Sequence, residues 1–343
     1  MPSLPPSLRN ILIRATNWIG DAIMTLPAVR SIRQNYPEAR ITVLAQPWVA
    51  DIFAADLHVD RVILYEKKGR HRGIGGMLRL ARELAPQRFD GVILLQNAFE
   101  AALIARLAGI PVIAGYSRDG RRPLLTHPVK LSDEIRRVHQ VHYYQNIVRQ
   151  LGLTPGPDKL YLPLAETEQR WAREFVAELP RPLVGINPGA AYGPAKRWPA
   201  ERYGELAARL AEESGGSVLV FGTAQDGEAV AVIRGACPAV IDLTGRTTLS
   251  QAMALIARLD LFVTNDSGLM HVAAAAATPL VAIFGSTSAV ETGPFADRVM
   301  VVQKDFPCIP CLKPECSTDF RCMLEIGVGE VLAGVHRLRG KAR

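Results

Sequence analysis

The residues best suited to chemistry lie where predicted strands turn into helices. A hydrophobic run at Leu261–Thr264 ends in the segment Asn265-Asp266-Ser267-Gly268, which is followed by His271 and an alanine-rich stretch. A strand that ends in Asp-Ser-Gly and leads into a helix gathers free backbone N–H groups at the positive end of the helix dipole. This junction therefore predicts binding of a phosphorylated or nucleotide-linked ligand.

A second junction lies at residues 187–199 and is rich in glycine and positive charge. Gly189 and Gly193 allow the backbone to come close to a ligand, and Lys196 and Arg197 add cations to the same loop. The arrangement is phosphate-binding in outline, but it is not the Walker A sequence. A surface loop with solvated charges is the alternative interpretation.

Asp21 stands at the first junction, between a strand at Ile11–Ala15 and a helix at Ala22–Asn35. A carboxylate at a helix N-terminus is stabilised by the helix dipole, and it is a suitable general base. An ordinary helix-capping aspartate is the alternative. Because this junction lies at the carboxyl edge of a parallel sheet, we expect Asp21 to face a ligand. The Gly-x-Gly-x-x-Gly dinucleotide fingerprint is absent from it.

Four of the five cysteines form the pattern C-x2-C-x4-C-x5-C: Cys308, Cys311, Cys316 and Cys322. In a cytoplasmic chain this favours metal binding or free thiols over disulfides. One structural zinc ion could be wrapped by such a loop, although the spacing is not a common zinc pattern. Zinc and free thiols therefore both remain open.

Strands and helices alternate along nearly the whole chain, and the pattern restarts at Leu183. Unbroken apolar runs of four to five residues are typical of strands covered on both faces. The fold class is therefore α/β, with two Rossmann-like doubly wound domains facing across a cleft. We expect domains at residues 1–165 and 166–326, with residues 154–157 (Thr-Pro-Gly-Pro) as the strongest linker signal.

Composition narrows the function classes. The chain has 343 residues, 48% of them hydrophobic, and a net charge of +7, which favours anionic partners. Aromatic residues make up only 6% and do not interleave with basic runs, so we expect no nucleic-acid partner. No apolar run is long enough for a membrane span, and residues 1–10 lack the apolar core of a signal peptide. We therefore expect a cytoplasmic protein.

Together, these three junctions occur in this order in the ADP-heptose–lipopolysaccharide heptosyltransferases, and the chain resembles that family from about Ile11 to Ile326. These enzymes are inverting glycosyltransferases of the GT-B fold. The Lys196-Arg197-Trp198-Pro199 segment and the downstream cysteines look most like the members that add the second inner-core heptose. Ala191 and Tyr192 replace hydroxyl residues of the first-heptose enzymes, which also favours that subtype.

The resemblance implies a role for each motif. Asp21 matches the base that deprotonates the acceptor hydroxyl, and Lys196 matches the cation at the departing diphosphate. The remaining residues implied to bind the ADP-sugar donor are Gly189, Glu228, Thr244, Gly245, Asp266, Ser267, Gly268 and His271. Asp226 competes with Glu228 for the ribose. No cofactor is required, since cationic side chains and a helix N-terminus replace a catalytic metal.

Acceptor binding is assigned to the first domain. The implied acceptor is lipid A–Kdo–heptose, whose carboxylates and phosphates suit basic loops, and the protein would work at the cytoplasmic face of the inner membrane. Basic loops follow two predicted strands, and Asn97 follows a third. The candidate residues are Lys67, Lys68, Arg70, Asn97, Arg118 and Arg121. Solvated basic loops are the alternative.

The resemblance also implies that the last segment, residues 327–343, is a helix that packs back on the first domain. Two other functions remain open. One is another sugar-nucleotide enzyme of the same fold, a different sugar transferase or an epimerase. The other is a non-catalytic basic module that binds nucleic acid or a membrane surface, against which the ligand-facing Asp21 and the lack of an aromatic platform argue.

Overall fold

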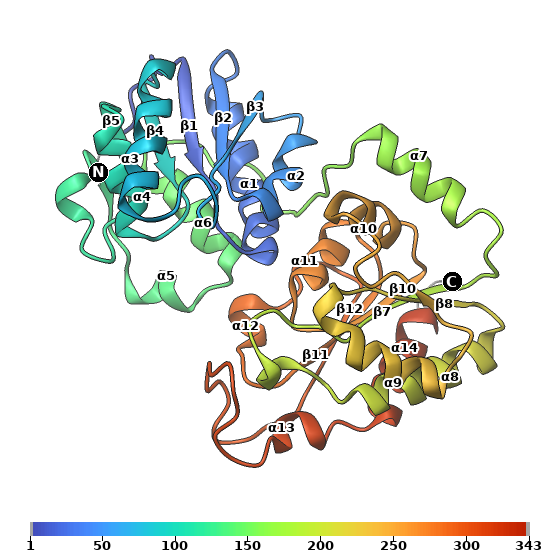
Figure 1. The fold of residues 1–343 in the computed structure, drawn as a ribbon. Helices are drawn as coiled ribbons and strands as arrows, with labels where there is room; N and C mark the ends of the chain where they lie inside the picture. Colours follow the sequence, from blue (N-terminus) through green and yellow to red (C-terminus); the bar gives the residue numbers. More distant parts are fainter. Residues whose placement is uncertain (1–2, 341–343) are drawn as a thin grey trace. The chain divides into compact units, whose positions relative to one another are not determined.

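The computed structural model describes residues 3–340, and the chain divides into two compact units, Met1–Pro163 and Leu164–Arg343. Each unit contains a six-stranded, wholly parallel sheet with helices on both faces (Figure 1). The predicted α/β class with two Rossmann-like sheets is confirmed. No helix within residues 3–340 combines the length and apolar character of a membrane span.

The first unit has the strand order β3-β2-β1-β4-β5-β6. The order of strands across the sheet therefore reverses between β1 and β4. Helices α1 and α6 pack together on one face, and α3 and α4 pack together on the other (Figure 1). The elements are β1 (Asn10–Arg14), α1 (Ile19–Asn35), β2 (Arg40–Ala45), α2 (Pro47–Ala54), β3 (Arg61–Leu64), α3 (Gly73–Leu84), β4 (Gly91–Leu94), α4 (Phe99–Leu107), β5 (Val112–Tyr116), β6 (His127–Val129), α5 (Asp133–Arg137) and α6 (Gln140–Gln150).

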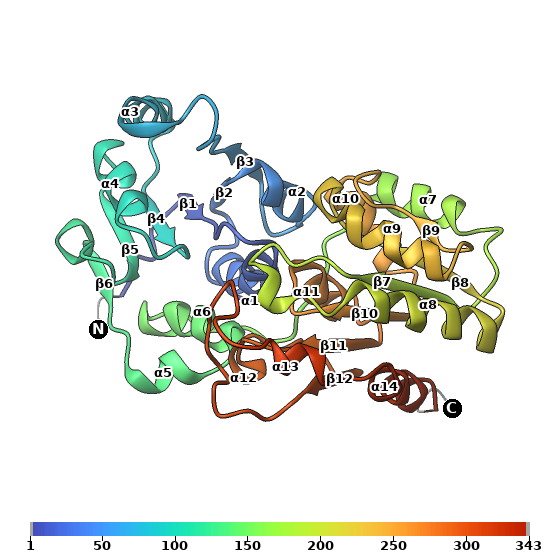
Figure 2. The same cartoon turned by 60° about the horizontal axis from the view of Figure 1, so that its bottom comes forward.

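The second unit repeats this plan with the order β12-β11-β10-β7-β8-β9, in which the order of strands reverses between β7 and β10. Figure 2 gives a second view of its layers. The elements are α7 (Glu166–Phe175), β7 (Leu183–Asn187), α8 (Ala200–Ser214), β8 (Ser217–Val220), α9 (Gly227–Ala236), β9 (Ile241–Asp242), α10 (Leu249–Ile256), β10 (Leu261–Asn265), α11 (Gly268–Ala275), β11 (Leu280–Phe284), α12 (Ala289–Thr292), β12 (Val299–Gln303), α13 (Arg321–Leu324) and α14 (Val328–Gly340).

Burial explains why apolar runs form these strands. Every residue of β7, β10 and β11 is buried, because helices cover both faces of the sheet. Ligands of such sheets bind outside the carboxyl ends of the strands, at the point where the strand order reverses. In the second unit that point lies beyond β7 and β10, whose register pairs Ile186 with Val263.

The segment with the strongest linker signal is held by hydrogen bonds to the first unit. Residues 154–157 are not a free linker, because Thr154 N–H donates to Asn35 Oδ1 at 3.0 Å and Gly156 N–H donates to Ser31 Oγ at 2.9 Å. Both partners lie on α1, so this segment is held on the first unit.

The final helix, α14, packs on elements of its own unit. Its apolar residues Val331 and Val335 are fully buried in the second unit's own core, against β11, β12 and α8. That the segment also packs back on the first domain stays a prediction. Residues 341–343 of that segment lie outside the described residues. The sequence analysis also did not assign β6, β12, α5, α12 and α13.

Candidate functional site

Lys196 forms a buried ion pair at the carboxyl edge of the second sheet. It ends the 3-10 turn Pro194–Lys196, and its Nζ lies 2.5 Å from Asp266 Oδ2. The two side chains are only 14% and 5% exposed. Thr287 Oγ1 donates to the same carboxylate oxygen at 2.5 Å. Loops that follow β7, β10 and β11 therefore converge on one charged centre.

Thr287 is a site residue that sequence analysis missed. It follows β11 in the loop Gly285-Ser286-Thr287, which carries no charge or motif of its own. Only the position of that strand next to β10 brings its hydroxyl to Asp266.

The N-terminus of α11 is organised by a polar network. Ser267 caps this eight-residue helix, and its Oγ accepts from Met270 N–H at 3.4 Å. Asn187 Nδ2 donates to the same oxygen at 2.9 Å, which ties the end of β7 to the helix start. The Ser267 hydroxyl is thus engaged within the protein. The backbone N–H groups at Gly268 and beyond supply the helix-terminal donors for an anion.

His271 also lies on α11, where it is 4% exposed. The next residues, Val272 to Ala275, are buried small side chains that allow the helix to pack closely on the sheet. The structure therefore places His271 in the packed part of the helix, one turn beyond its first residue.

The two acidic candidates near α9 differ in their environment. Asp226 is 9% exposed, and its carboxylate accepts from Thr223 N–H at 2.8 Å and from Thr223 Oγ1 at 3.0 Å. This capping interaction occupies Asp226. Glu228 is exposed in the first turn of α9. Glu228 is therefore the better placed of the two to accept from a ligand hydroxyl.

Gly189 and Gly245 bring backbone close to neighbouring groups. A Cβ atom on Gly189 would lie 2.7 Å from Asp226 Oδ1, so any other residue there would displace the Asp226 carboxylate. Gly245 has a φ of +67° and donates its N–H to Gly222 O at 3.0 Å. Thr244 N–H donates to Asp242 Oδ1 at 2.9 Å. These loops follow β7, β8 and β9, at the same edge of the sheet as Lys196.

In the first unit, Asp21 lies in the first turn of α1. Trp18, not Asp21, occupies the N-cap position, so Asp21 is not the residue that caps this helix. Tyr144 of α6 donates its hydroxyl to Asp21 Oδ1 at 3.5 Å. Burial, and then the negative charge of Asp21, raise the pKa of Tyr144, which keeps its proton available for this bond. Sequence analysis did not identify Tyr144.

Close to this junction, Arg14 is a buried cation at the end of β1. It is 2% exposed, and its guanidinium donates to Leu44 O at 3.2 Å and to Asn17 Oδ1 at 3.0 Å. Its Cζ lies 5.2 Å from the ring centre of Tyr65. Burial lowers the pKa of Arg14 to about 10. The side chain therefore fixes the loop between β1 and α1.

The basic loop after β3 is held by ion pairs and a ring contact. Lys67 pairs with Glu100, and Arg70 pairs with Glu83 at 2.5 Å. Lys68 Nζ lies 5.5 Å from the ring centre of Trp48. Each of the three predicted acceptor cations therefore already has a partner on the protein surface.

Arg121 differs most from its expected role. It is fully buried, and it donates to Tyr116 O at 2.8 Å and to Asn97 Oδ1 at 2.8 Å. Asn97 in turn donates to Tyr143 Oη at 2.6 Å. Burial lowers the pKa of Arg121 to about 10. Arg121 and Asn97 thus hold the loops after β4 and β5 together, whereas Arg118 is exposed.

The cysteine loop, residues 304–320, joins β12 to α13 and carries three of the four clustered thiols. All four cysteines are free, with Cys308 and Cys316 exposed and Cys322 buried. Burial, followed by the three other thiols, raises the pKa of Cys322. Within residues 3–340, no three His, Cys, Asp or Glu side chains are grouped as metal ligands.

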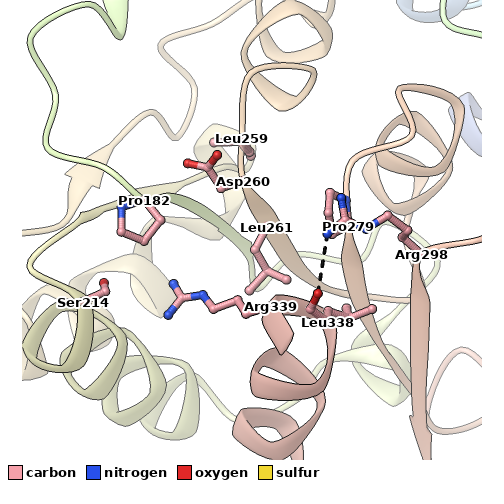
Figure 3. A pocket seen from close by; sticks show the side chains of 9 residues that line it. All are labelled: Pro182, Ser214, Leu259, Asp260, Leu261, Pro279, Arg298, Leu338 and Arg339. Atoms are coloured by element: carbon pink, nitrogen blue, oxygen red, sulfur yellow. Dashed lines mark hydrogen bonds between the residues drawn. The ribbon is translucent and has the colours of Figure 1, made fainter. Parts of the chain in front are cut away.

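A cavity of about 510 Å³ lies at the other edge of the second sheet (Figure 3). Its lining includes Pro182, Asp260, Pro279 and Arg298, which directly precede β7, β10, β11 and β12. The motif loops follow the carboxyl ends of the same strands. This cavity is therefore separate from the Lys196 site.

The chain is similar to known proteins over most of its length. The family model described as glycosyltransferase family 9 (heptosyltransferase) matches residues 77–320. Lipopolysaccharide heptosyltransferase 2 of Escherichia coli strain K12 is 35% identical over 306 residues, which cover 85% of this chain and 87% of that protein.

Two solved structures share the fold over nearly the whole chain. The structure of E. coli ADP-heptose lipopolysaccharide heptosyltransferase II has a TM-score of 0.82 and 31% identity, and the match covers 97% of this chain and 100% of that one. A glycosyl transferase family 9 structure from Veillonella parvula DSM 2008 has a TM-score of 0.90 and 26% identity, with coverage of 99% and 100%.

Proposed function

This chain belongs to glycosyltransferase family 9, and from that premise we propose that it transfers heptose from ADP-L-glycero-D-manno-heptose to the inner core of lipopolysaccharide. The observation that carries the proposal is the 35% identity with a lipopolysaccharide heptosyltransferase 2 over 85% of the chain. The same relative favours addition of the second heptose, onto a lipid A–Kdo–heptose acceptor. Because that acceptor is lipid-anchored, the enzyme would work at a membrane surface.

In the proposed reaction the second unit binds the donor. The departing group is ADP, whose diphosphate gains negative charge as the bond to the sugar breaks. The Lys196 ammonium and the N–H groups at the start of α11 are fixed before reaction, so they stabilise that charge without reorganisation. Asp266, held by Lys196 and Thr287, would contact the sugar, and Glu228 would accept from the ribose.

The first unit would bind the acceptor and supply the base. Asp21 takes the proton from the acceptor hydroxyl, whose oxygen then attacks the anomeric carbon from the side opposite ADP. The configuration at that carbon is thereby inverted. Tyr144, whose hydroxyl donates to Asp21 Oδ1, orients the carboxylate. Lys67, Lys68, Arg70 and Arg118 remain the candidates for acceptor phosphates, whereas Arg121 acts from within the fold.

The test is a turnover assay with purified protein. ADP-heptose is compared with ADP-glucose and with UDP- and GDP-sugars, on lipid acceptors that carry no heptose or one heptose. We expect product only with ADP-heptose, a preference for the one-heptose acceptor, and an inverted anomeric centre by NMR.

Asp21→Asn is the matched control, because it keeps the size of the side chain. We expect it to bind ADP normally and to lose about 10²–10⁴-fold in turnover. Turnover of another nucleotide sugar alone would reassign the enzyme to a different sugar. Unchanged turnover in the variant would remove Asp21 as the base.

A further inference from the structure

Tyr192 lies between Lys196 and the cysteine loop. The Lys196 Nζ atom is 4.8 Å from the centre of the Tyr192 ring, a distance at which an aromatic face attracts a cation. The Tyr192 hydroxyl donates to Leu312 O at 2.6 Å. One side chain therefore contacts both the ammonium and a segment 120 residues away in sequence.

The cysteine loop is attached at two further points near the charged centre. Ala195 N–H donates to Pro314 O at 3.0 Å, directly before Lys196. Leu312 N–H donates to Ser286 O at 2.9 Å, directly before Thr287. The cysteine loop is therefore hydrogen-bonded to the residue before Lys196 and to the residue before Thr287. Lys196 and Thr287 are the two residues that hold the Asp266 carboxylate.

We propose that Tyr192 is a positioning residue for Lys196, and that the cysteine loop fixes Lys196 through it. This inference rests on the proposed function, in which Lys196 neutralises the donor diphosphate. A lysine side chain is long and flexible, so it loses conformational entropy when it binds an anion. Holding the side chain in place beforehand reduces that loss. The ring restricts the ammonium, and the bond to Leu312 O restricts the ring.

A purely structural role for Tyr192 makes different predictions. Tyr192 is 42% exposed, so it could simply pack on the loop surface. Loss of such packing would weaken the binding of all ligands of the second unit to the same extent. It would do so whether or not Lys196 is present. Loss of positioning would weaken the binding only of ligands that carry phosphate charge, and only in protein that contains Lys196.

The experiment is a double-mutant cycle read by calorimetry with ADP and adenosine as ligands. Tyr192→Phe keeps the ring and removes the bond to Leu312 O, whereas Tyr192→Leu removes both. We expect ADP affinity to fall about threefold in the first and about tenfold or more in the second. Adenosine affinity should not change in either. In a Lys196→Ala background, neither variant should lower ADP affinity further.

Kinetics and a control complete the test. We expect a lower kcat/KM for the ADP-sugar in both variants, with kcat falling as well as KM rising, because Lys196 also meets the charge that develops on the departing diphosphate. Phe175→Leu, another exposed aromatic of the second unit on α7, should leave ADP affinity unchanged. Should Tyr192→Leu not fold, Tyr192→Phe decides alone.

The failures of the two proposals are distinguishable. If Lys196→Ala leaves ADP affinity unchanged, the proposed role of Lys196 fails. If Lys196→Ala weakens ADP but the Tyr192 effects persist in its background, or extend equally to adenosine, the positioning role is overturned and the proposed function stands. Unchanged ADP affinity in Tyr192→Phe would overturn the part assigned to the cysteine loop.

Discussion

In the variant Lys196→Ala, the carboxylate of Asp266 loses the ammonium that lies 2.5 Å from its Oδ2 atom. Asp266 is only 5% exposed, so little solvent reaches its carboxylate to compensate for the missing charge. Thr287 still donates one hydrogen bond to the same oxygen. The variant should therefore be less stable as well as weaker in ADP binding.

The size of the loss can be worked from this geometry. At 2.5 Å and an effective dielectric constant of about 20, the two charges attract by roughly 6–7 kcal/mol before desolvation is subtracted. Removing one partner of a buried pair typically costs about 3–5 kcal/mol. Because Thr287 continues to donate to Asp266, we expect about 3 kcal/mol, at the lower end of that range.

Urea unfolding followed by tryptophan fluorescence measures this loss. The background Trp18→Phe/Trp48→Phe leaves Trp171 and the buried Trp198, both in the second unit. In the matched variant Lys196→Ala/Asp266→Asn, the neutral amide needs no counter-charge.

We expect the double variant to regain at least about 2 kcal/mol relative to Lys196→Ala alone. ADP should also raise the urea midpoint of the native protein more than that of either variant. Equal urea midpoints for the native protein and Lys196→Ala, with no recovery in the double variant, would refute the reasoning that this pair is a buried, stabilising one.

Four further perturbations test other parts of the two units. Tyr144→Phe should lower kcat about threefold to tenfold, because the long bond to Asp21 contributes about 1 kcal/mol; an equal loss in an Asp21→Asn background would contradict this. Gly193→Ala should destabilise the second unit by about 1–3 kcal/mol in urea unfolding, since its Cβ would lie 2.3 Å from Pro314 O; native-like stability would show that the loops separate freely. Cys311→Ser should lower the melting temperature by about 2–4 °C with little change in kcat; an intact melting temperature with a collapsed rate would place the cysteine loop in the chemistry. Activity should survive EDTA, because Lys196 and a helix N-terminus stabilise the charge on the diphosphate; a loss of activity that only Mg²⁺ or Mn²⁺ restores would refute this.

The sequence alone determined most of the strands and the edge at which the motifs meet. Apolar runs such as Leu261–Thr264 cannot stay solvated, so they become buried parallel strands. The chain then leaves each strand at its carboxyl end, where Asn187 ends β7 and Asp266 follows β10. Chain order and burial therefore sufficed to predict that Lys196 and Asp266 belong to one edge of one sheet.

Other features depended on contacts that leave no local mark in the sequence. Arg121 and Arg118 look alike in a basic loop, yet only packing against the loops after β4 and β5 buries Arg121. Tyr144 meets Asp21 across 123 positions because α6 packs on α1.

The same holds for the end of the chain. The apolar stripe of α14 predicts burial but not which surface buries it, and in the structure α14 packs on β11 and β12 of its own unit. The bond from Tyr192 to Leu312 O spans 120 positions. Spacing in the sequence fixes which side chains a strand or helix presents, whereas the surface that receives them is set only when distant segments pack together.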